Sequence, residues 1–149
     1  MPRDNNIGVL EELAQTYCDA GANGDKEYYQ KAIDIFKKIK EQGMGDYDTE
    51  YNLAVLYQNT GDYSNAAETL ENILDVYGED YRTYKSLAYL EVSKQNALAV
   101  ELRNYSKFGE YYEKAEELYQ KESSSNANDA DMERLQELYS QAKTNGWLK

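Results

Sequence analysis

The chain contains no histidine, one proline and one cysteine among its 149 residues. Histidine is the most common general base, metal ligand and pH-sensitive side chain near neutrality, so its absence argues against an enzyme. We expect no catalytic residues, no cofactor and no metal site. The lone Cys18 excludes an internal disulfide, and no obvious basic neighbour activates it as a reactive thiol. Because the proline is Pro2, none interrupts a helix later in the chain.

Positive charge and long apolar runs are also scarce. Lysine and arginine total 16 against 28 aspartates and glutamates, a formal net charge of -12 that would repel phosphates. No stretch approaches the roughly 18 apolar residues of a membrane span, and the N-terminus lacks the apolar core of a signal peptide. We therefore expect a soluble, cytoplasmic protein that binds a protein or peptide, binds no nucleic acid and does not insert into membranes.

Apolar residues recur at three- and four-residue steps throughout the chain, which is typical of amphipathic helices. The first such face carries Ile7, Leu10, Leu13, Ala14 and Tyr17. Turn-forming glycines and polar residues separate the periodic segments. The sequence predicts seven helices, at residues 6–20, 26–42, 47–59, 63–77, 81–94, 105–121 and 129–144.

One stretch resembles a known repeat. Leu53, Ala54 and Tyr57, followed by Ala66 and Leu70, match the spacing of the tetratricopeptide repeat (TPR), a helix pair of about 34 residues. The small alanines allow two helices to approach closely while the larger residues fill the space between them. Departures from the TPR pattern occur at Glu50, Gly78 and Glu91, which stand where Trp, Pro and Tyr are usual.

The resemblance implies an all-α fold, a right-handed TPR superhelix (α-solenoid) of three helix pairs plus a C-terminal capping helix. The repeats would occupy residues 7–46, 47–80 and 81–121 of a single domain, 1–149, with a linker at 122–128 and the cap at 129–148. Such a cap covers the apolar end of a solenoid. We expect Met132, Leu135, Leu138 and Ala142 on its inner face, and Trp147 folded back after Gly146.

The second helix of the third repeat has two possible alignments. One places Ala115 at the position of Ala66, and the other aligns residues 104–108 with residues 62–66. We favour the second, because it preserves a polar-Tyr-Ser helix start and leaves residues 94–103 as an inserted loop in which a short helix is possible. It places the large Phe108 at a position that is normally small.

Residues 80–148 are also similar to the C-terminal TPR tails of some bacterial multidomain proteins, many of which carry a serine/threonine kinase domain. The similarity rests on the order Asp80-Tyr81-Arg82, Asn104-Tyr105-Ser106-Lys107 and Gly146-Trp147-Leu148. The kinase motifs themselves are absent. The resemblance implies a role in signalling, as a separate protein or as a tail, and a tail that follows a membrane span could be extracytoplasmic.

In TPR proteins the first helices of the repeats line a concave groove that binds a peptide. We therefore predict a non-catalytic protein–protein interaction module. The alternatives are a plain solvated surface, or a structural spacer or oligomerisation domain without a peptide ligand, although we favour a monomer. The groove residues predicted by position are Glu11, Gln15, Tyr51, Val55, Gln58, Arg82, Lys85 and Tyr89, with Cys18, Asp19, Asn59 and Val92 beside them. Of the 16 tyrosines, those at the packing positions of the repeats are expected in the core, at least Tyr17, Tyr57, Tyr84, Tyr105 and Tyr112.

Overall fold

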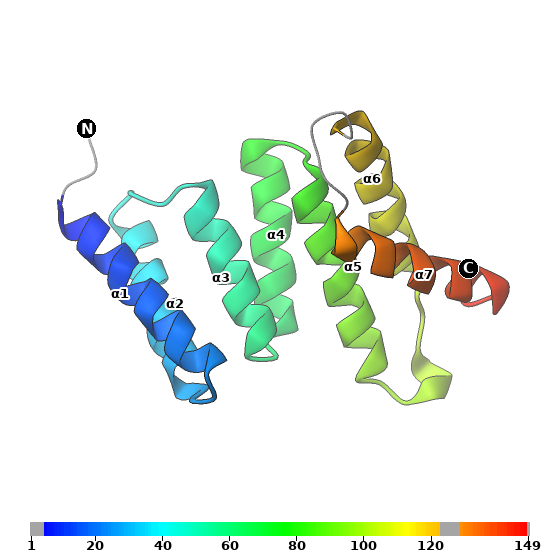
Figure 1. Ribbon diagram of the computed structural model, residues 1–149, viewed down its shortest axis with the longest axis horizontal. Helices are drawn as coiled ribbons and strands as arrows, with labels where there is room; N and C mark the ends of the chain where they lie inside the picture. The colour runs from blue at the N-terminus through cyan, green and yellow to red at the C-terminus, as the bar shows by residue number, and fades with distance from the viewer. Residues whose placement is uncertain (1–4, 123–128, 149) are drawn as a thin grey trace. The chain divides into compact units, whose positions relative to one another are not determined.

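The computed structural model describes residues 5–122 and 129–148, with side chains from Ile7 onward. Within these ranges the chain is all-helical, with seven α-helices, one short 3-10 helix and no strand (Figure 1). The elements are α1 (Asn5–Ala22), α2 (Glu27–Glu41), α3 (Tyr47–Asn59), α4 (Tyr63–Tyr77), α5 (Tyr81–Asn96), η1 (Val100–Leu102), α6 (Ser106–Glu122) and α7 (Ala130–Thr144).

The seven helices predicted from the sequence are confirmed, and their ends differ by at most two residues. Of the predicted linker 122–128, Glu122 ends α6 and residues 123–128 lie outside the described residues. The chain divides into two compact units, residues 1–73 (unit 1) and 74–149 (unit 2), and the division falls inside α4. Each unit is described by itself below.

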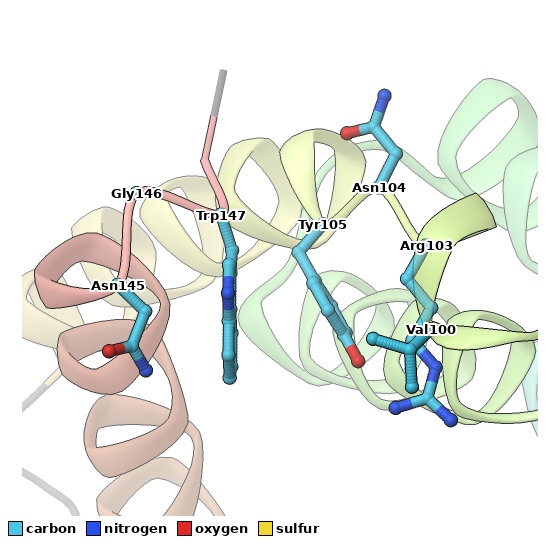
Figure 2. Close-up of a pocket in the computed structure, with 7 residues that line it drawn as sticks. All are labelled: Val100, Arg103, Asn104, Tyr105, Asn145, Gly146 and Trp147. Atoms are coloured by element: carbon cyan, nitrogen blue, oxygen red, sulfur yellow. The ribbon is translucent and has the colours of Figure 1, made fainter.

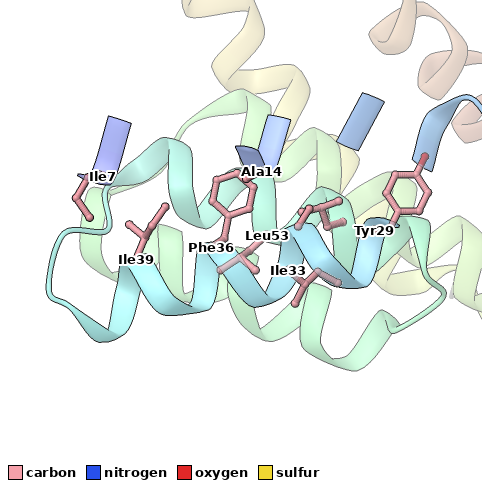
Figure 3. Close-up of a cluster of buried hydrophobic side chains, with 9 residues drawn as sticks. Ile7, Ala14, Tyr29, Ile33, Phe36, Ile39 and Leu53 are labelled. Atoms are coloured by element: carbon pink, nitrogen blue, oxygen red, sulfur yellow. The ribbon is translucent and has the colours of Figure 1, made fainter. Parts of the chain in front are cut away.

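The core of unit 1 is built around α2, which packs against both α1 and α3. Tyr29, Ala32, Ile33, Phe36 and Ile39 form one buried face of this helix because they follow the 3.6-residue period. The residues that pack against this face are Ile7 and Ala14 from α1, and Leu53 and Leu56 from α3 (Figure 3).

The predicted apolar face of α1 needs one correction. Leu13 was expected inward with Ala14, yet it is 40% exposed while Ala14 is fully buried. The two are one helical step, about 100°, apart. The side that α2 covers is centred on Ile7, Ala14 and the half-buried Leu10, so Leu13 lies at its margin.

The first helices of the two later predicted repeats begin with the same local structure. Asp46 caps α3 by accepting a hydrogen bond from the Thr49 N–H (3.0 Å), and Asp80 caps α5 by accepting one from the Thr83 N–H (2.8 Å). Both threonines are buried, and each hydroxyl also donates to its capping carboxylate. Such caps satisfy helix N–H groups that have no partner within the helix.

Unit 2 packs α5 and α6 as a close pair, with α7 against both. Helix α6 begins at Ser106, one residue after the start that the favoured alignment predicted, and Phe108 is fully buried. Tyr139 of α7 packs against it, with ring centroids 6.5 Å apart, and against Tyr112 at 4.7 Å. The next residue, Gly109, lets the C-terminal turn approach α6 closely, because an added Cβ would lie 3.0 Å from Leu148.

The inner face predicted for the capping helix is confirmed for Met132, Leu135 and Ala142, which are buried, while Leu138 is half-buried. Asp129 caps the start of α7 through the N–H groups of Asp131 and Met132. At the other end, Gly146 adopts a φ of 70°, and the Trp147 N–H donates to the Ala142 carbonyl at 2.8 Å. This is the predicted glycine C-cap, and it turns Trp147 back toward α6.

Candidate functional site

The predicted groove residues of unit 1 lie on α1 and α3. Tyr51, Val55 and Gln58 are spaced by four and three positions, so they share one face of α3. Val55 is 39% exposed, and Tyr51 stacks on Tyr47 with ring planes 9° apart. This α3 face (Tyr51, Val55 and Gln58) therefore offers an aromatic, an apolar and an amide group to a partner.

The two predicted residues of α1 differ in exposure. Gln15 is exposed, but its amide donates to the Asp19 carboxylate at 3.0 Å. Glu11 is half-buried. Cys18, four positions after Ala14, is half-buried as well; burial and then the charge of Asp19 raise the pKa of its thiol, which keeps it protonated and unreactive at neutral pH.

The predicted groove residues of unit 2 lie on α5, and α7 contacts two of them. The Lys85 ammonium forms ion pairs with Asp129 (3.1 Å) and Asp131 (3.5 Å). The Tyr89 hydroxyl donates to the Asp131 carbonyl at 3.2 Å. Lys85 was predicted to line the groove, but only 15% of its side chain is exposed. Arg82, at the start of α5, is exposed.

Two groups at this contact, Asp129 and Tyr89, have shifted pKa values. Burial alone would raise the pKa of Asp129, but the hydrogen bond and charge of Lys85 and two backbone N–H groups outweigh it, so the pKa lies below its ordinary value. Burial, followed by the charge of Asp131, raises the pKa of Tyr89. Both groups therefore keep their usual charge near neutrality, and the α5–α7 contact persists there.

Beyond Tyr89, the same face of α5 leads to two cavities inside unit 2. The smaller cavity, about 210 Å³, is lined by Val92 and Asn96 of α5, Phe108 of α6 and the end of α7. The larger, about 440 Å³, lies between the 97–105 segment and the C-terminal turn. The two share Arg103, Tyr105 and Trp147, and the larger is also lined by Val100, Asn104, Asn145 and Gly146 (Figure 2).

Side chains fix the geometry of the larger cavity. The Tyr105 ring stands between Trp147 on one side and Arg103 with Val100 on the other (Figure 2). The Tyr105 and Trp147 ring centroids are 5.6 Å apart, and the Tyr105 hydroxyl donates to the Asn96 side chain at 2.7 Å. Asn104 points away from these groups and accepts from the Ser106 N–H, which starts α6.

Arg103 holds the inserted segment to the end of α5. Its Nε donates to the Leu98 carbonyl at 2.9 Å and its Nη2 to the Asn96 carbonyl at 3.1 Å. Both acceptors are neutral, and among the described residues no carboxylate forms an ion pair with Arg103. Arg103 therefore lines the cavity without an ion-pair partner among the described residues.

Sequence reasoning missed this cavity, although it identified the segments that form it. The insertion at 94–103 was predicted as a loop in which a short helix is possible, and Trp147 as a residue that folds back on its own helix. A signal was available: Arg103 is the one cation between Lys94 and Lys107, and it stands at the end of an insertion relative to the repeat. The sequence did not indicate that residues 100–105 lie close to residues 145–147.

Comparison with known proteins gives no relative. No protein-family model matches the chain, and a search of curated proteins finds no match. Within the described residues, no cluster of three or more His, Cys, Asp or Glu side chains is placed to hold a metal ion. None of the helices in residues 5–122 and 129–148 is both long and apolar enough to cross a bilayer.

Proposed function

We propose that this chain is a non-catalytic protein-interaction module of the tetratricopeptide type, which binds a peptide or protein segment across the outer faces of its first helices. The 34 positions that separate Asp46 from Asp80 and Thr49 from Thr83 support the repeat, because TPR units are about 34 residues long. Ala54 and Ala66, which stand at the small-residue positions of the TPR pattern, are both buried, and this also favours it.

The observation that carries the binding role is the α3 face. Tyr51, Val55 and Gln58 present aromatic, apolar and amide groups in a row on a helix whose opposite side is fixed in the core by Leu53 and Leu56. A rigid helix that displays a mixed row of this kind can bind an extended or helical segment with little loss of its own entropy.

The test uses the full chain as bait and a matched pair of variants. Tyr51→Ala/Val55→Ser alters the α3 face, and Val76→Ser/Tyr77→Ala makes the same two changes at exposed residues of α4. A partner captured by the wild type should be lost with the first variant and retained with the second. Equal capture by both variants would remove the α3 face from consideration.

A specific observation favours self-association as a second candidate. Val9 is 62% exposed and Leu13 is 40% exposed, one turn apart on α1. Two α1 helices could bury these side chains against each other. If this is the function, light scattering should show a dimer that Val9→Asp/Leu13→Asp converts to a monomer, whereas a wild-type monomer at high concentration would reject it.

A further inference from the structure

We propose that the 440 Å³ cavity beside Arg103 and Trp147 is a second recognition site, which binds a polypeptide segment that places a carboxylate side chain next to an aromatic one. The site is separate from the α3 face, and the proposal stands whether or not that face binds a partner. It rests on the charge, composition and openness of the cavity.

Charge is the first reason. Among the described residues that line the two cavities, Arg103 is the only charged one, and none is acidic. The rest of the chain is strongly acidic, with 28 Asp and Glu residues in 149. A third hollow in unit 2 shows the contrast, since it is lined by Glu110, Glu113 and Glu117 with Lys114. Because no carboxylate lines this cavity, it is a favourable place for an anionic group.

The donor geometry of Arg103 supports the same ligand. The Nε–H and one Nη2–H are directed to backbone carbonyls, which hold the guanidinium in place. A guanidinium has five N–H groups, so the remaining ones can donate to a carboxylate. Because Arg103 has no ion-pair partner among the described residues, an incoming carboxylate would not have to displace an existing ion pair.

The aromatic wall supplies the second half of the recognition. Trp147 and Tyr105 lie too close together, at 5.6 Å, for another ring to enter between them. A ligand ring would instead pack on their exposed edges and on Val100, which is 72% exposed. A cavity of about 440 Å³ is large enough for side chains of this size, and its exposed rim leaves room for a chain to pass across it.

The chain carries its own reporter for the test, because Trp147 is its only tryptophan and it lines the cavity. Three peptides, acetylated and amidated at their ends, would be titrated against the full chain: Ala-Phe-Glu-Ala, Ala-Phe-Gln-Ala and Ala-Ala-Glu-Ala. Tryptophan fluorescence and the Trp147 indole N–H signal in NMR would follow binding. The Phe-Glu peptide should bind about tenfold or more tighter than either control, since a charge-assisted hydrogen bond and a buried ring are each worth that much.

Protein variants locate the effect. Val100→Asp places a carboxylate at the cavity, and Leu102→Asp places one at a similarly exposed residue of the same 3-10 helix that does not line it. We expect Val100→Asp to weaken the Phe-Glu peptide about tenfold and Leu102→Asp to change its affinity far less. Arg103→Gln should remove the preference for Glu over Gln, whereas Arg134→Gln, which removes an exposed arginine of α7, should not.

Several results would overturn the proposal. They are no saturable change at Trp147, equal affinity for the Glu and Gln peptides, or equal affinity for the Phe and Ala peptides. Equal effects of Val100→Asp and Leu102→Asp would do the same. The comparison between peptides on the unaltered protein remains decisive even if Arg103→Gln disturbs the inserted segment that Arg103 holds.

Discussion

Helices α3 and α5 begin with the same capped turn, but their outer faces differ in what they contact. Moving 34 positions along the chain takes Tyr51, Val55 and Gln58 of α3 to Lys85, Tyr89 and Val92 of α5. On α3 Val55 is exposed, while Tyr51 and Gln58 are half-buried. On α5 the same positions contact α7 through two ion pairs and a hydroxyl, and end at a cavity that α7 shares.

The difference shows that framework and surface are set by different residues. The capping aspartate and threonine, and the buried Leu53 or Leu87 with Ala54 or Ala88, fix where each helix starts and which side faces its core. Whether the opposite side is available for binding depends on what else in the chain packs there. In unit 2 that is α7, and only the end of the α5 face stays open, as the cavity beside Trp147.

The largest effect is expected from loosening α7 in unit 2. Leu135 is completely buried in this helix, so Leu135→Ala should destabilise unit 2 by about 2–5 kcal/mol through lost burial and the cavity left behind. Native-state hydrogen exchange should show the loss in α5, α6 and α7 while α1 and α2 keep their protection. An equal loss of protection in both units would mean that they unfold together, and the faces of α3 and α5 could then not be compared as independent structures.

A somewhat smaller effect is expected where the alanines face the core. Ala54→Leu and Ala66→Leu should each cost about 1–3 kcal/mol, because both side chains are almost completely buried and the added atoms must displace neighbours. Chemical denaturation measures the loss. Wild-type stability in both variants would contradict the TPR register assigned to α3 and α4.

These cases also show how far the sequence could be interpreted. Periodicity and turn residues predicted all seven helices, because each buries one regular face, as α2 does with Ile33 and Phe36. The Asp46–Thr49 and Asp80–Thr83 caps were missed, although their 34-residue spacing is visible in the sequence. The cavity and the α7 contact with Lys85 depend on residues about 40 or more positions apart, and local pattern carries no information on such approaches.

The contact between α5 and α7 should respond to acid. Asp129 has a pKa below its ordinary value of 3.8, so its pairing with Lys85 stabilises the folded state fully above that value and is lost as the pH falls through the lower pKa. Lys85→Met should therefore cost about 1–3 kcal/mol at neutral pH and much less in acid, once the pH has fallen below the lowered pKa of Asp129. Denaturation at both pH values checks this. If Lys85→Met lowered the stability by the same amount at both pH values, the ionised Asp129 would not be what stabilises the contact between α5 and α7.

The smallest effect tests whether the two capped starts are equivalent. Asp46→Ala and Asp80→Ala each remove the acceptor of a helix N–H group and of a buried threonine hydroxyl, so each should cost about 1 kcal/mol. Asp48→Ala, an exposed aspartate two positions into α3, provides a control with the same loss of charge.

Hydrogen exchange at the first turns of α3 and α5 would report each cap separately, because an uncapped helix frays from its end. If both caps contribute equally, the contrast between the helices lies entirely in their outer faces. A cost at Asp80 well above that at Asp46 would instead mean that α7 also stabilises the start of α5. The Lys85 contact with Asp129 would then extend its influence to the first turn of the helix, and the α5 face would be coupled to its own cap.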